Sequence, residues 1–306
     1  MTFNNNLGDY SDRGSSMSGG GGGFNGGGRG GGNAIIGLIA GLVGRKFGIP
    51  GVIIAGLAVA FFSAGGPSMF SGGAGQQASE GGSLDHCKTA QDANENDDCR
   101  IFATGVSLDE YWTAALPENE GIEYEAPELR IAEGNINTGC GSANISQTGP
   151  FYCPGDQTVY MSIPFFDQLK EMGGSNGSFA QQYVTAHEFA HHIQQQQGTL
   201  SLSDYNDPGA ESGAVKIELQ ADCYAGLWAS NADKGPDAMI DPITQEQVNQ
   251  AIQTAQAIGD DAIQSSSGQE VNPDLWTHGS SEQRTDAFIR GYQGGTMASC
   301  AQDFNR

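Results

Sequence analysis

Ala186-His187-Glu188-Phe189-Ala190-His191-His192-Ile193 is the stretch of this 306-residue sequence that decides the predicted fold. Apolar residues recur with a helical period around it, and no Gly or Pro occurs between residues 178 and 197, which predicts a helix. Residues four apart share one helical face, so His187 and His191 can bind the same metal ion. Glu188 lies about 100° further round the helix, where it could reach a metal-bound water. Two His ligands with a Glu base are typical of zinc hydrolases.

A third ligand is predicted on a second helix, over residues 213–231. Glu218 and Asp222 are four residues apart and share a face. Glu218 would complete a His₂Glu zinc site that leaves one position for water, and Asp222 could accept the other ring N–H of a zinc-binding histidine. Glu211 is an alternative ligand, but no carboxylate follows it four residues later, so Glu218 is favoured.

The residues around this motif limit the kind of site. Gln occupies positions 194 and 197, which excludes a three-histidine site of the H-E-x-x-H-x-x-G-x-x-H type. His192 lies off the ligand face and is expected to be a solvated or hydrogen-bonded neighbour. A polar helix face that holds three histidines without binding metal is the alternative interpretation.

Three segments together resemble the bacterial "putative neutral zinc metallopeptidase" family, a membrane-anchored relative of the gluzincins. They are Ala186-His187-Glu188-Phe189-Ala190-His191-His192-Ile193-Gln194, Glu218-Leu219-Gln220-Ala221-Asp222-Cys223-Tyr224-Ala225-Gly226 and Gly149-Pro150-Phe151-Tyr152-Cys153-Pro154. The similarity runs from about Leu84 to Cys300. It implies a Zn²⁺ cofactor and an α+β fold, a gluzincin-like zincin domain with a small β-sheet and active-site helices.

Further roles follow from resemblance alone. Residues 276–284 resemble the His-…-Arg segment after the third ligand in HtpX-like peptidases. His278 is thereby a candidate donor to an oxyanion, and Arg284 a candidate partner for a buried acid such as Asp222. A helix N-terminus capped by a serine, with His278 merely near it, is the alternative. In gluzincins the strand before the active-site helix pairs with substrate at the sheet edge, which places residues 158–163 there, unless they form an ordinary strand.

An uncharged apolar run over residues 47–65 predicts a single transmembrane helix within a membrane segment at 34–66. Its length, about 28 Å as a helix, is close to the thickness of the hydrocarbon core. Arg45 and Lys46 precede it, which orients the N-terminus inside and the catalytic domain outside the bacterial inner (cytoplasmic) membrane. A membrane hairpin with its bend at these two residues, or a buried helix of the domain, are the alternatives.

The other segments are assigned by composition. Residues 1–33 are Gly-rich and expected to be disordered, residues 67–83 form a flexible linker, and residues 84–306 form the zinc metallopeptidase domain. Within that domain, Ser107-x-x-Glu110 predicts the start of a helix that ends before Pro117.

All six cysteines follow the apolar run, an even number on the predicted exported side, which is typical of disulfides. Proximity in the sequence suggests three of the 15 possible sets of pairs, namely Cys87–Cys99, Cys140–Cys153 and, as the remainder, Cys223–Cys300. A cysteine-ligated metal site is disfavoured because no Cys-x-x-Cys motif is present.

The predicted function is that of a membrane-anchored extracytoplasmic zinc metalloendopeptidase that acts on a peptide or protein substrate, with Glu188 as general base. Tyr224 is a further candidate donor to the oxyanion. The net charge of −23 argues against a nucleic-acid partner. A non-catalytic, zinc-stabilised binding or chaperone-like module and a zinc amidase acting on cell-wall material are the alternatives.

Overall fold

A computed structural model describes residues 2–18 and 84–301. Its main sheet has four strands in the order β1-β2-β6-β5, and a separate hairpin is formed by β3 and β4. β1 pairs with β2 and β2 with β6 in parallel, whereas β5 runs antiparallel to β6. The strands are β1 (Ser15–Ser18), β2 (Glu128–Glu133), β3 (Asn135–Thr138), β4 (Gly141–Asn144), β5 (Phe151–Cys153) and β6 (Thr158–Met161).

Strand order corrects one expectation for substrate binding. The segment predicted at the sheet edge, residues 158–163, contains β6, which pairs with a strand on each side. Sequence proximity to the active-site helix does not determine strand order, because the pairing is non-local. The strand that lies at the edge of the sheet nearest the helix with His187 and His191, α6 (Ser178–Gln196), is β5.

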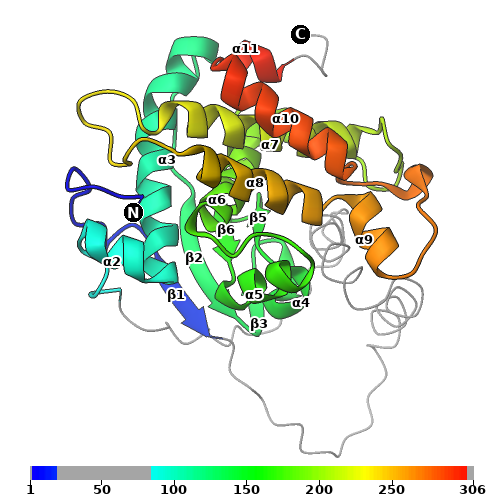
Figure 1. The fold of residues 1–306 in the computed structure, drawn as a ribbon, viewed down its shortest axis with the longest axis horizontal. Helices are drawn as coiled ribbons and strands as arrows, with labels where there is room; N and C mark the ends of the chain where they lie inside the picture. Colours follow the sequence, from blue (N-terminus) through cyan, green and yellow to red (C-terminus); the bar gives the residue numbers. More distant parts are fainter. Residues whose placement is uncertain (1, 19–83, 302–306) are drawn as a thin grey trace, which may run out of the picture.

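Helices make up most of the described chain, and α6 lies at their centre (Figure 1). It contacts α3, α7, α8 and β5, and nearly every one of its residues is buried. A helix that is buried on all sides belongs to the core. The helices are α2 (Ala90–Glu95), α3 (Asp97–Glu120), α4 (Ile145–Thr148), α5 (Ile163–Glu171), α6 (Ser178–Gln196), α7 (Gly213–Asn231), α8 (Gln245–Ala257), α9 (Asp260–Ser266), α10 (Ser281–Gly294) and α11 (Met297–Cys300), with single 3-10 turns at Leu200–Leu202 and Pro273–Leu275.

Two glycines allow α7 and α10 to approach closely. A Cβ atom added to Gly226 would lie 2.1 Å from the carbonyl oxygen of Phe288, and one added to Gly291 would lie 1.8 Å from that of Cys223. Both distances are far below van der Waals contact, so no larger residue fits at either position without moving a helix. This close packing brings α10 against the helix that carries the predicted third ligand.

The first residues of the chain are part of the folded body, contrary to the predicted disorder of residues 1–33. Phe3, Leu7 and Tyr10 are buried in the main core, and β1 extends the sheet. Main-chain amides of Thr2 and Phe3 donate to Asn94 Oδ1. The prediction was wrong because it used the average composition of residues 1–33, whereas the sequence is glycine-rich only after residue 18. The average composition concealed the three apolar residues that enter the core. The rest of the predicted tail lies outside the described residues.

Arg13 connects this N-terminal segment to the core. Its guanidinium forms an ion pair with Asp109 on α3, and it lies 5.5 Å above the ring of Phe189 on α6. Replacing Arg13 with methionine is expected to destabilise the protein by about 1–3 kcal/mol, because a partly buried carboxylate loses its partner. Urea unfolding measures this. Lys234→Met is the control, since the Lys234 side chain is 67% exposed, and an equal effect of the two changes would contradict the anchoring role.

The predicted transmembrane helix and single-pass location are corrected. Within residues 2–18 and 84–301, no helix is both long and apolar enough to cross a membrane. The run at 47–65 lies outside the described residues. The segments that flank it pack against each other in one body, so both lie on the same side of any membrane. The predicted orientation had placed them on opposite sides.

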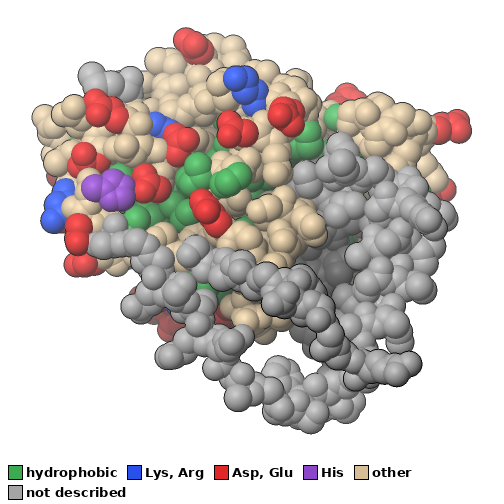
Figure 2. Space-filling model, turned by 90° about the horizontal axis from the view of Figure 1, so that it is seen from below, with side chains coloured by type: hydrophobic (Ala, Val, Ile, Leu, Met, Phe, Trp, Pro, Cys, Tyr) green, Lys and Arg blue, Asp and Glu red, His purple; other side chains and the backbone are tan. Residues whose placement is uncertain are grey.

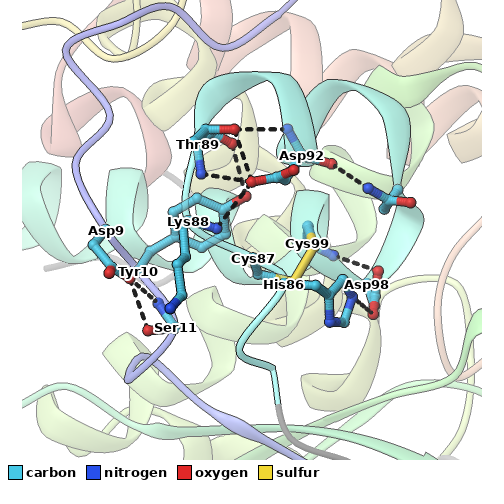
Figure 3. Close-up of a disulfide and its surroundings, with 11 residues drawn as sticks. Asp9, Tyr10, Ser11, His86, Cys87, Lys88, Thr89, Asp92, Asp98 and Cys99 are labelled. Carbon is cyan, nitrogen blue, oxygen red and sulfur yellow. Dashed lines mark hydrogen bonds and ion pairs between the residues drawn. A yellow bond between two sulfur atoms is a disulfide. The ribbon is translucent and has the colours of Figure 1, made fainter.

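The three disulfides join the pairs that sequence proximity suggested. They are Cys87–Cys99, Cys140–Cys153 and Cys223–Cys300. The first lies beside the N-terminal segment, where residues 9–11 run past the start of α2 (Figure 3). The second ties β5 to the turn of the β3–β4 hairpin, and the third ties α7 to α11. The first two disulfides therefore stabilise elements that contact α6, and the third stabilises the contact between α11 and α7.

Candidate metal centre

α6 and α7 bring His187, His191 and Glu218 together in the core. The Oε2 atom of Glu218 lies 3.2 Å from His187 Nε2 and 3.7 Å from His191 Nε2. The two imidazole rings have centroids 4.8 Å apart and are nearly perpendicular. All three side chains are at least nine-tenths buried, and one ligand atom from each lies within 4.8 Å of the others. This group could hold a metal ion.

The chemistry of the donor atoms fits zinc. His187 Nδ1 lies 2.8 Å from Asp222 Oδ1, and His191 Nδ1 lies 2.9 Å from Gln194 Oε1. Both oxygens are acceptors, so each neutral ring carries its proton on Nδ1 and a lone pair on Nε2. Two imidazole nitrogens and one carboxylate make up a common zinc donor set. The ring positions that face one another are thus the ones suited to binding a cation.

Asp222 accepts hydrogen bonds from several buried side chains next to the candidate ligands. It is fully buried and accepts hydrogen bonds from His187 Nδ1, from Tyr183 at 2.5 Å and from two nitrogens of Arg284 at 2.8 and 3.0 Å. Burial alone would raise the pKa of Asp222, but Arg284 and His187 outweigh it and lower the pKa to about 2. The pair between Arg284 and Asp222 is the one suggested from the sequence, and it keeps Asp222 ionised.

Glu188 lines the same cavity as the three ligands. Burial raises the pKa of its carboxyl group to about 7, against the opposite influence of His187. The main-chain amide of Tyr152, at the centre of β5, also faces this carboxyl group. A metal cation beside Glu188 would lower the pKa, so the group would be ionised at neutral pH.

His278 approaches the cavity from the loop before α10. Asp260 at the start of α9 accepts three main-chain N–H groups, from Thr277, His278 and Gly279, and thereby fixes this loop. Asp260 Oδ1 also lies 3.4 Å from His278 Nδ1. Burial acts to lower the pKa of His278, but Asp260 and Glu218 outweigh it and raise the pKa. His278 Nε2 is buried and has no hydrogen-bond partner among the described residues, while Ser280 caps α10 as the alternative expected.

Two residues of the site escaped sequence reasoning. Tyr205, in the loop before α7, lines the cavity and donates from its hydroxyl to Glu218 Oε1 at 2.9 Å. Asp260, described above, holds His278 in place. Tyr205 lies on a connecting segment and Asp260 is the first residue of the short helix α9, and neither has a spacing that links it to the H-E-x-x-H motif. A search of the sequence for every tyrosine and carboxylate near a predicted ligand would have included both residues. It would not have distinguished them from the many others that it returned.

Other candidates lie elsewhere. Glu211 is exposed and lines a separate surface pocket with Lys216 and Arg290. Tyr224 exchanges hydrogen bonds with Gln197 and packs against Trp112, away from the residues that line the cavity. His192 is fully buried and bonded at both nitrogens, to the hydroxyl of Tyr152 and to a main-chain carbonyl. It is hydrogen-bonded rather than solvated.

One other group of potential ligands occurs in the described part of the chain, and it does not compete. His86, Cys87, Asp98 and Cys99 have ligand atoms close together. The two sulfurs are bonded to each other, and His86 and Asp98 form an exposed pair (Figure 3). Because zinc binds thiolates rather than disulfide sulfurs, this group lacks the donors of a zinc site in the oxidised protein.

Comparison with known proteins identifies the family of this chain. A profile of the family described as "Putative neutral zinc metallopeptidase" matches residues 4–303. The uncharacterized protein Rv2575 of Mycobacterium tuberculosis (strain ATCC 25618 / H37Rv) is 41% identical over 223 residues, 71% of this chain and 74% of its own length. The uncharacterized protein YpfJ of Escherichia coli (strain K12) is 37% identical over 212 residues, 68% of this chain and 72% of its own. No solved structure matches the chain. The chain belongs to the "Putative neutral zinc metallopeptidase" family.

Proposed function

We propose that this protein hydrolyses peptide bonds, with a zinc ion held by His187, His191 and Glu218. One observation carries the proposal, namely that the buried carboxyl group of Glu188 lines the same cavity as these three ligands. A zinc site that only stabilises the fold has four protein ligands and needs no base beside them. At this centre only three candidate ligands converge among residues 2–18 and 84–301, which leaves the fourth position on zinc open to a reacting molecule.

When bound, zinc supplies Lewis acidity, which lowers the pKa of water to about 7 and polarises a carbonyl group. Glu188 accepts the proton of the attacking water on its carboxylate and later delivers it to the leaving amine. His278 lines the cavity, its pKa is raised, and its Nε2 has no hydrogen-bond partner within residues 2–18 and 84–301. It therefore donates from Nε2–H to the oxygen on which negative charge develops. Tyr205 and Asp222 hold Glu218 and His187 in position.

The substrate that this cavity suits is an extended peptide with an apolar side chain beside the scissile bond. Within the described residues, β5 pairs with β6 on one side only, so its other edge can add a strand of substrate. Several side chains that line the cavity are apolar, namely Phe151, Phe165, Val184, Leu200 and Ile258. Acidic side chains outnumber basic ones on the face shown in Figure 2, which disfavours a polyanionic substrate.

Metal removal tests this function. The full chain, produced under oxidising conditions, is expected to cleave a denatured protein mixture. A chelator should abolish cleavage, and one equivalent of zinc should restore it. Cleavage that persists without metal would contradict the mechanism. Bound zinc without cleavage of protein would instead support the binding module, and turnover of cell-wall fragments alone would support the amidase.

A further inference from the structure

A chain of two buried glutamine amides leads away from His191 and ends on main-chain carbonyl groups. Gln194 Oε1 lies 2.9 Å from His191 Nδ1. Gln194 Nε2 lies 2.7 Å from the carbonyl oxygen of Ile217 and 3.0 Å from Gln220 Oε1. Gln220 Nε2 lies 3.3 Å from the carbonyl oxygen of Cys300. Gln194 is fully buried and Gln220 is 4% exposed, so water does not offer these amides alternative partners.

The direction of hydrogen bonding along this chain is fixed by its far end. A carbonyl oxygen can only accept, so the groups that face Ile217 and Cys300 must be the NH₂ groups of the two amides. The remaining terminal atom of Gln194 is then its oxygen, which can also only accept. His191 must therefore donate from Nδ1. Its lone pair is left on Nε2, the atom that faces Glu218.

We propose that Gln194, supported by Gln220, is a positioning residue that fixes the ring tautomer and orientation of His191 for metal binding. The proposal rests on the metal ligands of the proposed function, but it concerns a property of the chain that exists before any metal binds. It gives a role to the glutamine at position 194, where three-histidine zinc sites have glycine.

The two histidines thus differ in the group that accepts the hydrogen bond from their Nδ1 atom. His187 donates to the ionised carboxylate of Asp222, whereas His191 donates to a neutral amide. An amide can present either its oxygen or its NH₂ group to a histidine, so it fixes a tautomer only if its own orientation is fixed. Ile217 supplies that constraint from α7, and Gln220 adds a second one through Cys300.

Gln220 also connects the metal centre to the third disulfide. Cys300 is bonded to Cys223, which directly follows Asp222 on α7. The Cys300 carbonyl group, on α11, is consequently tied by this disulfide to α7, the helix that carries Glu218 and Asp222. Because Gln194 keeps the Ile217 carbonyl if Gln220 is lost, the two glutamines are expected to contribute unequally.

The first measurement is the ¹⁵N–¹H ring spectrum of the zinc-free full chain, labelled at histidine. Neutral His191 should be present as the Nδ1–H tautomer alone. Gln194→Met removes the acceptor while keeping a similar volume, and should give a mixture of tautomers. Gln182→Met is the matched control on the same helix, because Gln182 is fully buried and its amide has no partner among the described residues. It should leave the His191 signals unchanged.

The second measurement is zinc affinity, by competition with a chelator of known affinity. Gln194→Met should weaken zinc binding by about 10–100-fold, Gln220→Met by less, and Gln182→Met not at all. A wild-type His191 that carries its proton on Nε2 would overturn the proposal, even if the Gln194 variant does not fold. Equal zinc affinity for wild type and Gln194→Met would also overturn it. A wild type that binds no zinc but shows the expected tautomer would contradict the proposed function and support the positioning of His191.

Discussion

Replacing Glu188 with glutamine is expected to leave one zinc bound per chain and to lower kcat for peptide hydrolysis by about 10²–10⁴-fold. Glutamine has nearly the same size and can still face the amide of Tyr152, but it cannot accept a proton from water. Beside a metal cation the wild-type carboxyl group is ionised at neutral pH, so it combines the ability to accept a proton with a position in the cavity. The amide removes the basicity and keeps the position.

Steady-state cleavage of a fluorogenic peptide, together with metal analysis, measures this effect. Glu211→Gln is the matched control. Glu211 was the alternative ligand considered from the sequence, and it is exposed on the surface. It should retain full activity and full zinc content. Undiminished turnover by Glu188→Gln would show that another group takes the proton.

Removing the carboxylate of Asp222 by substitution with alanine is expected to destabilise the zinc-free protein by about 3–5 kcal/mol. The change leaves the guanidinium of Arg284 buried without its partner, and it removes the acceptors of Tyr183 and His187. That loss is a large part of the stability of an ordinary domain. In the fraction that folds, zinc affinity should fall by about 10–100-fold, since His187 is no longer held in one tautomer.

Urea unfolding of the zinc-free chain separates the stability effect from metal binding. Asp286→Ala is the control, because Asp286 lies on the same helix as Arg284 but is exposed. Substitution of Asp222 by asparagine should be less damaging than by alanine, since it keeps two hydrogen-bonding atoms. If Asp222→Ala unfolded at the same urea concentration as wild type, the buried network would not hold α7 and α10 together.

The group of side chains that could bind a metal could be predicted from the sequence because its geometry is local. His187 and His191, like Glu218 and Asp222, are spaced so that a regular helix places each pair on one face. Disulfide pairing was also local for the first two pairs, which are 12 and 13 residues apart. The third pair, 77 residues apart, followed only because two cysteines remained.

Features that depend on non-local packing could not be predicted in this way. The place of β5 at the sheet edge depends on strand order, and Tyr205 and Asp260 reach the site from a loop and from the start of α9. The start of α3 was also predicted wrongly. Ser107 resembles a cap, but it is buried within the helix and accepts a hydrogen bond from Trp228. Pro117 lies inside the last turn, and the helix ends at Glu120, followed by Gly121 as the C-cap with φ of 67°.

Anomalous diffraction at the zinc edge from crystals of the zinc-loaded full chain tests the central claim most directly. The expected result is one zinc bound by His187 Nε2, His191 Nε2 and the carboxylate of Glu218, with no fourth protein ligand and with Glu188 beside the open position. A zinc ion with four protein ligands, or one bound away from these three side chains, would contradict a catalytic role for this centre.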